Sequence, residues 1–332
     1  MIPTPYAVSI RRFLALLSFP ETITMILLIA AFAVSASLSP YFLDIRYLLD
    51  STSLYMEVGL MALAMTLVII SGNIDLSIAS NLALTAVICA KLYSSLGVPM
   101  AVALILAPVI GSALGLANGL VVTMLRLPSL AVTLGTLALY RGLAQVLVGD
   151  HSIGHFPDWF TGIDYRYLGP MPMPLLIFLG AAVLFALLLH KTVFGRCVFA
   201  VGTNELAAKF SGIRTGRVKL AIFTLSGAMA GCGAMMMLSR LSVARYDLAL
   251  GDELAVITTV VLGGTDIFGG RGTILGTALA LLLLDIIRRG MGVANVSAED
   301  QLAVTGALLV AAVLLARLSA GIGRRVSLIS HR

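Results

Sequence analysis

Charged residues are scarce in this 332-residue chain. Asp, Glu, Lys and Arg together make up 11% of the sequence and hydrophobic residues make up 59%, whereas about a quarter of the residues of an average soluble domain are charged. This composition excludes a soluble globular domain and indicates an all-α polytopic membrane protein. The formal net charge of +6 does not predict nucleic-acid binding, because the basic residues gather at the ends of apolar runs, where they set the orientation in the membrane.

Residues with catalytic or metal-binding chemistry are also few. The three cysteines are scattered, and His151 and His155, although four positions apart, lie in a loop rich in Pro and Gly. No HExxH or GxSxG sequence occurs, and the glycine-rich stretch 263–272 lacks the Lys and Ser or Thr that end a phosphate-binding P-loop. We therefore expect no enzyme activity, no cofactor and no metal site. Any ATP hydrolysis must take place on a separate subunit.

Long apolar runs are abundant instead. A helix needs about 20 apolar residues to cross the hydrocarbon layer, and runs of this kind predict about ten helices in one transmembrane domain, residues 1–332. The predicted spans are residues 22–39, 54–71, 77–93, 98–124, 129–148, 172–190, 218–239, 252–265, 272–289 and 301–318. Both termini would then be cytoplasmic, with 14 of the 22 basic residues inside, 7 outside and Arg141 within a span. This bias agrees with the preference of cytoplasmic loops for Lys and Arg.

Two polar loops stand out between the spans. Residues 191–218 are strongly basic, so we expect this loop in the cytosol. Residues 149–171 hold three aspartates and the single tryptophan and would form the main outer loop, which either contacts a partner or drapes over the bundle. Within the span 98–124, Gly111, Gly115 and Gly119 recur every four residues. Such a stripe suits close helix packing, within one chain or between subunits.

The basic loop contains a short helix with both ends marked, at residues 203–212. Thr203 or Asn204 can cap its first turn, Glu205 suits the positive end of the helix dipole, and Gly212 can close it in the left-handed conformation.

One face of this short helix is apolar. Leu206 and Phe210 are four positions apart and therefore share a face. The pattern fits a plug for a partner protein, and it also fits a connector tucked under the bundle of its own chain.

Two stretches predict an internal repeat with halves at residues 22–148 and 172–318. Each has a β-branched apolar run, small residues, an Asp and a new apolar helix, and Gly72 and Gly263 lie 191 positions apart. Repeated halves with Gly-interrupted helices are typical of transporters. Alternatively, Asp75 and Asp266 are simply N-caps of the helices that follow.

Several ionisable residues fall within or near apolar runs, where they are costly and mark a pathway or an internal ion pair. Arg141 is the clearest case: it could donate to sugar hydroxyls, or it could pair with Glu57 or Asp285. Asp252 and Glu253 are expected at a span entrance, facing water. The candidate residues of the path or its gate are Gly72, Asn73, Asp75, Arg141, Gly263, Gly264, Asp266, Gly269, Gly270 and Arg271.

Several motifs resemble the permease subunits of bacterial sugar ATP-binding cassette (ABC) importers. They are Gly72-Asn73-Ile74-Asp75-Leu76-Ser77, Leu127-Pro128-Ser129, Thr133-Leu134-Gly135-Thr136, the stretch from Gly202 to Ile213, and Val261-Leu262-Gly263-Gly264-Thr265 with Gly269-Gly270-Arg271-Gly272. Within that family the chain is most similar to the rhamnose-type and autoinducer-2-type permeases. The resemblance implies a fold of about ten spans and import of a monosaccharide or autoinducer-2 across the bacterial inner membrane.

The resemblance also implies partners and a coupling helix. The partners are two cytosolic ATPases, a second permease subunit (identical or related) and a periplasmic sugar-binding protein, with membrane lipid around the spans. The coupling residues are Asn204, Glu205, Leu206, Ala207, Ala208, Lys209, Phe210 and Gly212. Transport would follow alternating access driven by the ATPases. The alternative is an ion-gradient-driven secondary transporter, with Asp75, Arg141 and Asp266 as a relay.

Overall fold

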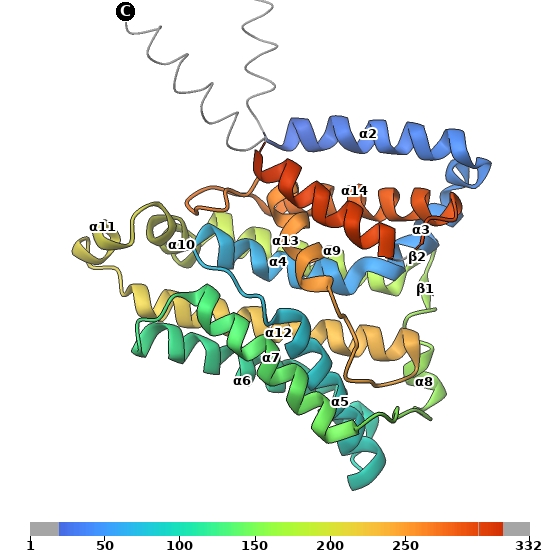
Figure 1. The fold of residues 1–332 in the computed structure, drawn as a ribbon, viewed down its shortest axis with the longest axis horizontal. Helices are drawn as coiled ribbons and strands as arrows, with labels where there is room; N and C mark the ends of the chain where they lie inside the picture. Colours follow the sequence, from blue (N-terminus) through green and yellow to red (C-terminus); the bar gives the residue numbers. More distant parts are fainter. Residues whose placement is uncertain (1–19, 298, 315–332) are drawn as a thin grey trace, which may run out of the picture.

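The structure is a computed structural model that describes residues 20–297 and 299–314. Helices dominate the described part (Figure 1). The long helices are α2 (Pro20–Leu38), α4 (Met56–Ile70), α5 (Ile78–Leu96), α6 (Met100–Met124), α7 (Ser129–Val148), α9 (Met173–Lys191), α12 (Thr215–Leu241) and α14 (Ile274–Val293). The shorter elements are η1 (Pro40–Leu43), α3 (Ile45–Thr52), η2 (Ser53–Tyr55), α8 (Asp158–Thr161), β1 (Tyr167–Leu168), β2 (Met171–Pro172), α10 (Val193–Thr203), α11 (Glu205–Phe210) and α13 (Asp252–Leu262).

Seven helical segments in the described part are long and apolar enough to cross a membrane. They are Glu21–Leu38, Ile45–Ile70, Ile78–Leu96, Met100–Met124, Ser129–Val148, Met173–Lys191 and Thr215–Leu241. These segments match the first seven predicted spans, and they confirm an all-α polytopic membrane protein.

The last three predicted spans fare differently. The span at 252–265 is wrong as a full crossing, because α13 has 11 residues and is roughly 17 Å long, against about 30 Å for the hydrocarbon layer. Helix α14 is long enough but carries three charged residues near its end: Arg289 pairs with Asp285 at 2.8 Å, and Arg288 lies over the Tyr55 ring. Residues 299–314 are helical, and the rest of the last predicted span lies outside the described residues, as do both termini.

Helix α4 lies at the centre of the bundle. All 15 of its residues are buried, and it packs against α9, α12, α13 and α14. A helix that is apolar all round is expected in the interior. Its one acid, Glu57, is buried and forms an ion pair with Arg240 near the end of α12.

Helices α6 and α12 pack closely against each other through glycine. A Cβ atom on Gly111 would lie 2.2 Å from the carbonyl oxygen of Gly227, and one on Gly115 would lie 2.2 Å from that of Phe223. Gly231 of α12 meets Ala107 of α6 in the same way. The glycine stripe therefore serves packing within the chain, as the first alternative predicted.

Two turns in the bundle share one backbone pattern. The turn after α4 contains Gly72 (φ 76°), and the turn after α13 contains Gly264 (φ 86°). In both turns the N–H of this glycine and that of the next residue bond to carbonyls three and five positions earlier, which is the Schellman motif. By these hydrogen bonds Gly72 takes the same place in its turn as Gly264, and not as Gly263, with which the sequence pattern aligned it.

The loop at residues 149–171, predicted to lie on the outer side, drapes over the bundle. Ile153 forms a β-bridge with Ala244, Phe160 is buried, and the Ser239 hydroxyl donates to the Phe160 carbonyl at 2.6 Å. Burial raises the pKa of Asp164 in this loop to about 6, although nearby Arg240 opposes the rise. The draping alternative is therefore confirmed for these residues. The loop and the β1–β2 hairpin lie at the end of the molecule opposite α11 (Figure 1).

The α6–α12 contact gives a test of the fold. Gly115→Ala should lower the stability by about 1–3 kcal/mol, because a methyl group has no space between the two backbones. Thermal unfolding of the purified protein in detergent, with the amount of protein in the membrane fraction, would measure the loss. Gly135→Ala is the matched control, because no atom lies within 4 Å of its Cβ position. Equal stability of the two variants would contradict this packing.

Candidate functional site

The short helix predicted in the basic loop is present as α11, and both of its caps are formed. The Asn204 side chain accepts the N–H of Ala207 at 2.9 Å. At the other end Gly212 has φ 85°, and the N–H of Ile213 bonds to the carbonyl of Ala208 at 3.0 Å. The predicted cap at Asn204 and the predicted left-handed Gly212 are confirmed.

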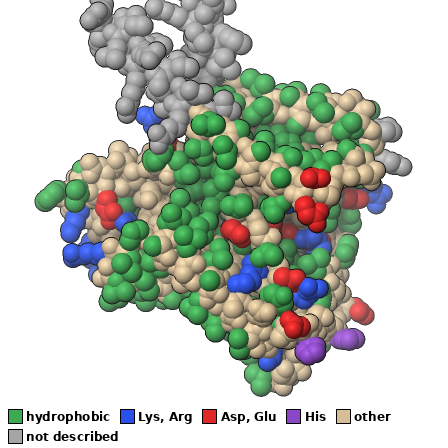
Figure 2. Space-filling model, in the orientation of Figure 1, with side chains coloured by type: hydrophobic (Ala, Val, Ile, Leu, Met, Phe, Trp, Pro, Cys, Tyr) green, Lys and Arg blue, Asp and Glu red, His purple; other side chains and the backbone are tan. Residues whose placement is uncertain are grey.

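The apolar face of α11 points away from the bundle. Leu206 is 69% exposed and Phe210 is 91% exposed, whereas Ala208 is buried against the core. The helix projects at one end of the molecule (Figure 1), and hydrophobic and basic side chains gather at that end (Figure 2). A connector tucked under its own bundle would bury these two side chains. That alternative is wrong for the described structure.

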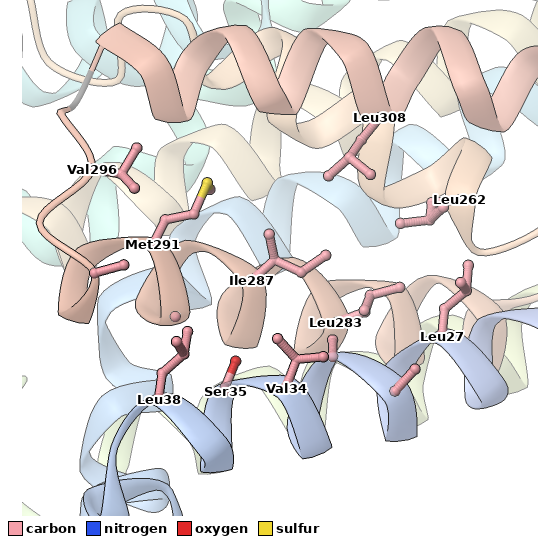
Figure 3. Close-up of a pocket in the computed structure, with 14 residues that line it drawn as sticks. Leu27, Val34, Ser35, Leu38, Leu262, Leu283, Ile287, Met291, Val296 and Leu308 are labelled. Carbon is pink, nitrogen blue, oxygen red and sulfur yellow. The ribbon is translucent and has the colours of Figure 1, made fainter.

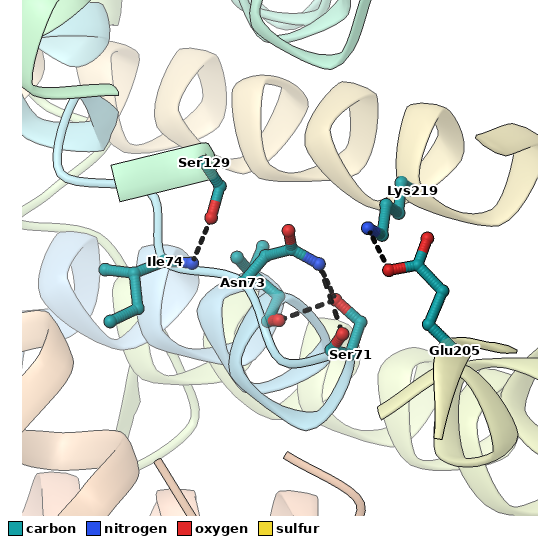
Figure 4. A network of polar contacts seen from close by, with 7 residues as sticks. Ser71, Asn73, Ile74, Ser129, Glu205 and Lys219 are labelled. Atoms are coloured by element: carbon teal, nitrogen blue, oxygen red, sulfur yellow. Dashed lines mark hydrogen bonds and ion pairs between the residues drawn. The ribbon is translucent and has the colours of Figure 1, made fainter. Parts of the chain in front are cut away.

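A salt bridge ties α11 to the membrane-spanning part of the chain. The Glu205 carboxylate accepts a hydrogen bond from Lys219 of α12 at 2.7 Å (Figure 4). Lys219 is largely covered, and Glu205 is about half exposed. Surface ion pairs contribute little stability, so this contact orients α11 more than it stabilises the fold.

Directly before α11, the end of α10 meets the turn after α4 and the glycines of the loop after α13 through backbone. A Cβ atom on Gly202 would lie 1.7 Å from the Ile70 carbonyl oxygen and 2.7 Å from the Gly270 nitrogen. The Gly270 N–H itself donates to the Ile70 carbonyl at 2.8 Å. Gly269 lies against Gly72 and Gly202 in the same way. We call this contact of residues 70–72, 202 and 269–270 the glycine junction.

The turn that follows α4 is held by side chains from its neighbours (Figure 4). The Asn73 amide donates to the Ser71 hydroxyl at 2.9 Å, and the Ile74 N–H donates to the Ser129 hydroxyl at 3.2 Å. Thr133 of α7 donates to the Ile74 carbonyl at 3.2 Å. A recess of about 400 Å³ opens here, lined by residues 72–74, 126–130, Lys219 and Ile267. The turn is thus clamped to α7 and lies close to the Lys219 that orients α11.

Asp75 is buried inside the bundle, 2% exposed. It accepts hydrogen bonds from the hydroxyls of Ser77 at 2.6 Å and Ser226 at 2.8 Å. Asn118 donates to the same Ser77 hydroxyl, and Tyr140 donates to Asn118. This network joins the start of α5 to α6, α7 and α12.

Asp266 lies in a different environment. Its carboxylate accepts the N–H of Phe268 at 3.0 Å, and its own N–H bonds to the carbonyl of Arg271. Thr273 caps α14 and Ser77 occupies the N-cap position of α5. Neither aspartate is therefore the N-cap that the alternative predicted.

Arg141 has neither of its predicted ion-pair partners. Its Nη1 atom donates to the carbonyls of Tyr246 and Leu248, both at 2.6 Å. Glu57 pairs with Arg240 and Asp285 pairs with Arg289 instead. The ion-pair prediction is wrong because each of these acids has another arginine beside it: Arg240 lies 183 positions from Glu57 in the sequence, and Arg289 lies four positions from Asp285 on the same helix. Arg141 stabilises the carbonyls of an irregular segment, residues 242–251.

Three residues of this site were not predicted to act there. Gly202, Ser129 and Lys219 hold the turn or the junction. Their sequence signals were slight: a glycine two residues before a helix cap, a serine after Leu-Pro, and one Lys at the start of an apolar run.

No group of three or more His, Cys, Asp or Glu suited to a metal ion occurs in the part of the chain that the structure describes. A pocket of about 420 Å³ between α2, α14 and residues 299–314 has Ser35 as its one polar side chain (Figure 3). Its lining suits apolar chains and not a polar solute.

Comparison with known proteins gives consistent results. The family described as "Branched-chain amino acid transport system / permease component" matches residues 47–313. The chain is 37% identical over 312 residues to the "Autoinducer 2 import system permease protein LsrD" of Escherichia coli strain K12, covering 92% of this chain and 91% of that protein, and the protein of the same name from Shigella flexneri matches equally. The protein of Escherichia coli O157:H7 is 37% identical over 302 residues, with 89% and 88% covered. No solved structure gives a significant match.

The glycine junction gives a test of the site. Gly202→Ala should push α10 away from α4, because the added methyl would overlap the Ile70 carbonyl. Hydrogen–deuterium exchange of the segment that contains Gly270 should then increase, since its N–H loses the Ile70 acceptor. Gly180→Ala serves as the control, because its Cβ position has no neighbour within 4 Å. Unchanged exchange in the Gly202 variant would show that the junction is not as tight as described.

Proposed function

Because this chain belongs to the permease family of sugar and autoinducer-2 ABC importers, we propose that it forms half of a membrane passage for a small sugar-like solute, driven by separate ATPases. The solute would be a monosaccharide of the rhamnose, pentose or hexose kind, or autoinducer-2. The chain acts as a single transmembrane domain of two repeat halves, residues 22–148 and 172–318. The loop 191–218 faces the ATPases, and the loop 149–171 faces the other side.

The observation that carries this proposal is the position of α11. A capped helix with an exposed Leu206 and Phe210 is built to enter a hydrophobic socket on another protein. Gly202 lies two residues before the cap of this helix and contacts the turn after α4 and the glycines of the loop after α13. A displacement of α11 would therefore reach the turn after α4 and the loop after α13 through contacts between backbones.

This arrangement supports alternating access. ATP-driven closure of two ATPases would move two copies of α11 together and shift α10 at the glycine junction. The turns after α4 and α13 would move with it, because Gly270 is bonded to Ile70. Gly72, Asn73, Gly263, Gly264, Gly269, Gly270 and Arg271 thus belong to a cytoplasmic gate. Coupling requires that the ATPase bind the two states with different affinity.

The expected partners follow from the same scheme. They are a cytosolic ABC ATPase dimer, a second permease subunit and a periplasmic binding protein that delivers the solute. The passage would lie between the two permease subunits in the bacterial inner membrane, with both termini in the cytoplasm. The relatives are named for autoinducer 2 import, so autoinducer-2 is the first solute to test.

A secondary transporter with an ion relay has less support. The relay would need Asp75, Arg141 and Asp266 in one path, but Asp75 bonds to two serines and Asp266 bonds within its own loop. Arg141 bonds to backbone carbonyls. The three side chains make no contact with one another among the described hydrogen bonds and ion pairs.

Phe210→Ser tests the docking role of α11. The aromatic ring makes little contact within this chain, so the variant should fold and enter the membrane normally. Loss of an aromatic anchor from a docking helix should weaken association with the ATPase about tenfold or more. Co-purification with the ATPase and solute-stimulated ATP hydrolysis in proteoliposomes would measure the effect.

Leu168→Ser is the matched control, because Leu168 is also strongly exposed but lies on the hairpin at the opposite end of the molecule. Full ATPase association of the Phe210 variant would refute the coupling role. Equal loss in both variants would point to a general effect of removing surface hydrophobes.

A further inference from the structure

A groove opens between α9, α10 and α12, beside the segment that carries α11. It has a volume of about 460 Å³, and its lining is mostly apolar, with Leu188 of α9 and Leu225 of α12 among its residues. Two polar side chains of α12 also line it, Thr224 and Arg217. The Thr224 hydroxyl donates to the Leu220 carbonyl of its own helix at 2.8 Å. Arg217 is therefore the residue that gives this groove a charge.

The groove runs from the membrane surface into the hydrocarbon layer. Helices α9 and α12 both belong to segments that can cross the membrane, and α12, with 27 residues, is roughly 40 Å long, enough to include both headgroup regions. Arg217 is the third residue of α12 and Leu225 is the eleventh, so they lie roughly 12 Å apart along the helix axis. The charged end of the groove is thus at the level of the lipid headgroups, and the apolar end is at the level of the acyl chains.

Apolar side chains beside the groove face outwards. On α9, Leu184 is 63% exposed and Leu187 is 52% exposed. Leu184 lies four positions before Leu188 and therefore on the same face of the helix. The groove accordingly opens onto a part of the surface that membrane lipid surrounds.

The charged end of the groove lies in a strongly basic part of the chain. Residues 191–219 contain six Lys or Arg and a single acid, Glu205, which is already paired with Lys219 at 2.7 Å. None of the ion pairs described for residues 20–297 and 299–314 involves Arg217, which is exposed. Figure 2 shows basic side chains among hydrophobic ones at the end where α11 projects. The electrostatics there favour an anionic group.

We propose that this groove binds an anionic phospholipid. One acyl chain lies along Leu188 and Leu225, and the phosphate accepts hydrogen bonds from the Arg217 guanidinium at the headgroup level. Basic pockets between membrane-spanning helices suit anionic headgroups, and a guanidinium matches the oxygens of a phosphate in a bidentate geometry. This inference goes beyond the proposed function, because it requires only that α9 and α12 cross the membrane.

A lipid fits this groove better than the protein that would dock on α11. A protein outside the membrane would have to enter it by roughly 12 Å to reach Leu225 from the level of Arg217. A phospholipid combines an anionic group and an apolar chain in one molecule, in the order that the groove presents their binding partners.

The bound lipid would also support α11. Helix α10 precedes α11 and α12 follows it, and both line the groove, through Phe194 and Arg217 respectively. Lys219, one turn or less beyond Arg217 on α12, holds Glu205 of α11. A lipid between α10 and α12 would therefore steady the two helices from which α11 projects.

Native mass spectrometry of the purified full-length protein tests the site, with phosphatidylglycerol and phosphatidylcholine added separately in detergent. The wild type should retain phosphatidylglycerol in preference to phosphatidylcholine. Arg217→Gln should weaken phosphatidylglycerol binding about tenfold, because charge-assisted hydrogen bonds to the phosphate are lost. Ala221→Phe should weaken binding of both lipids, because the ring would occupy the groove that Ala221 lines. Arg196→Gln is the matched control, since Arg196 is exposed in the same basic stretch but does not line the groove.

Three results would overturn the lipid site. An unchanged preference for phosphatidylglycerol in Arg217→Gln would show that the headgroup is not bound at Arg217. Equal losses in Arg217→Gln and Arg196→Gln would reduce the effect to a general attraction by the basic stretch. Unchanged lipid retention in Ala221→Phe, together with weaker association of the ATPase or of a second copy of the chain, would assign the groove to a protein partner. Arg217 is exposed, so its variant should fold normally and decide the question even if the Ala221 variant does not fold.

Discussion

The contact on which the rest of this structure depends is the backbone meeting at Gly202. Three segments that are far apart in the sequence touch there with no side chain between them, and the Gly270 N–H bonds across to the Ile70 carbonyl. A close-packed interior transmits displacement because it has no free space to absorb it. The small helix outside the bundle and the two interrupted helices inside it are thereby parts of one mechanical unit. Glycine is required by the lack of space and not by flexibility.

Polar groups within the membrane need hydrogen-bond partners, just as the helices need close packing. Irregular backbone is tolerated at membrane depth only where protein or water satisfies it. Side chains supply these hydrogen bonds. Thr24 donates to the carbonyl of Leu262 at the end of α13, and Thr133 donates to the carbonyl of Ile74. Arg141 donates to two carbonyls of residues 242–251. The buried acids Glu57 and Asp285 have arginine partners.

Local features of the fold could be predicted from the sequence, and long-range ones could not. The caps of α11 depend on residues within a few positions of one another, so Gly212 could be assigned directly and the N-cap could be narrowed to Thr203 or Asn204. The apolar runs likewise predicted the first seven spans. The partner of Arg141 could not be predicted, since it lies more than a hundred positions away and consists of backbone carbonyls. The short length of α13 could not be predicted either, because an apolar run in the sequence does not show where a helix begins and ends within the membrane.

The two Schellman turns show the same limit. The sequence pattern aligned Gly72 with Gly263, whereas the backbone hydrogen bonds give Gly72 the same place in its turn as Gly264. The two aspartates that follow lie in different surroundings, Asp75 among serines and Asp266 in its own loop. The glycine junction was not foreseen because steric closeness of three backbones has no pattern in sequence beyond the glycines themselves.

The exposed Phe210 has a consequence for the life of the protein in the cell. A bare aromatic ring on a surface helix is the kind of feature that chaperones and proteases recognise on unassembled chains. Until a partner covers Phe210, each newly inserted copy exposes this ring and can be recognised as unassembled. Cellular quality control would therefore hold the abundance of this subunit close to the supply of the partner that covers Phe210.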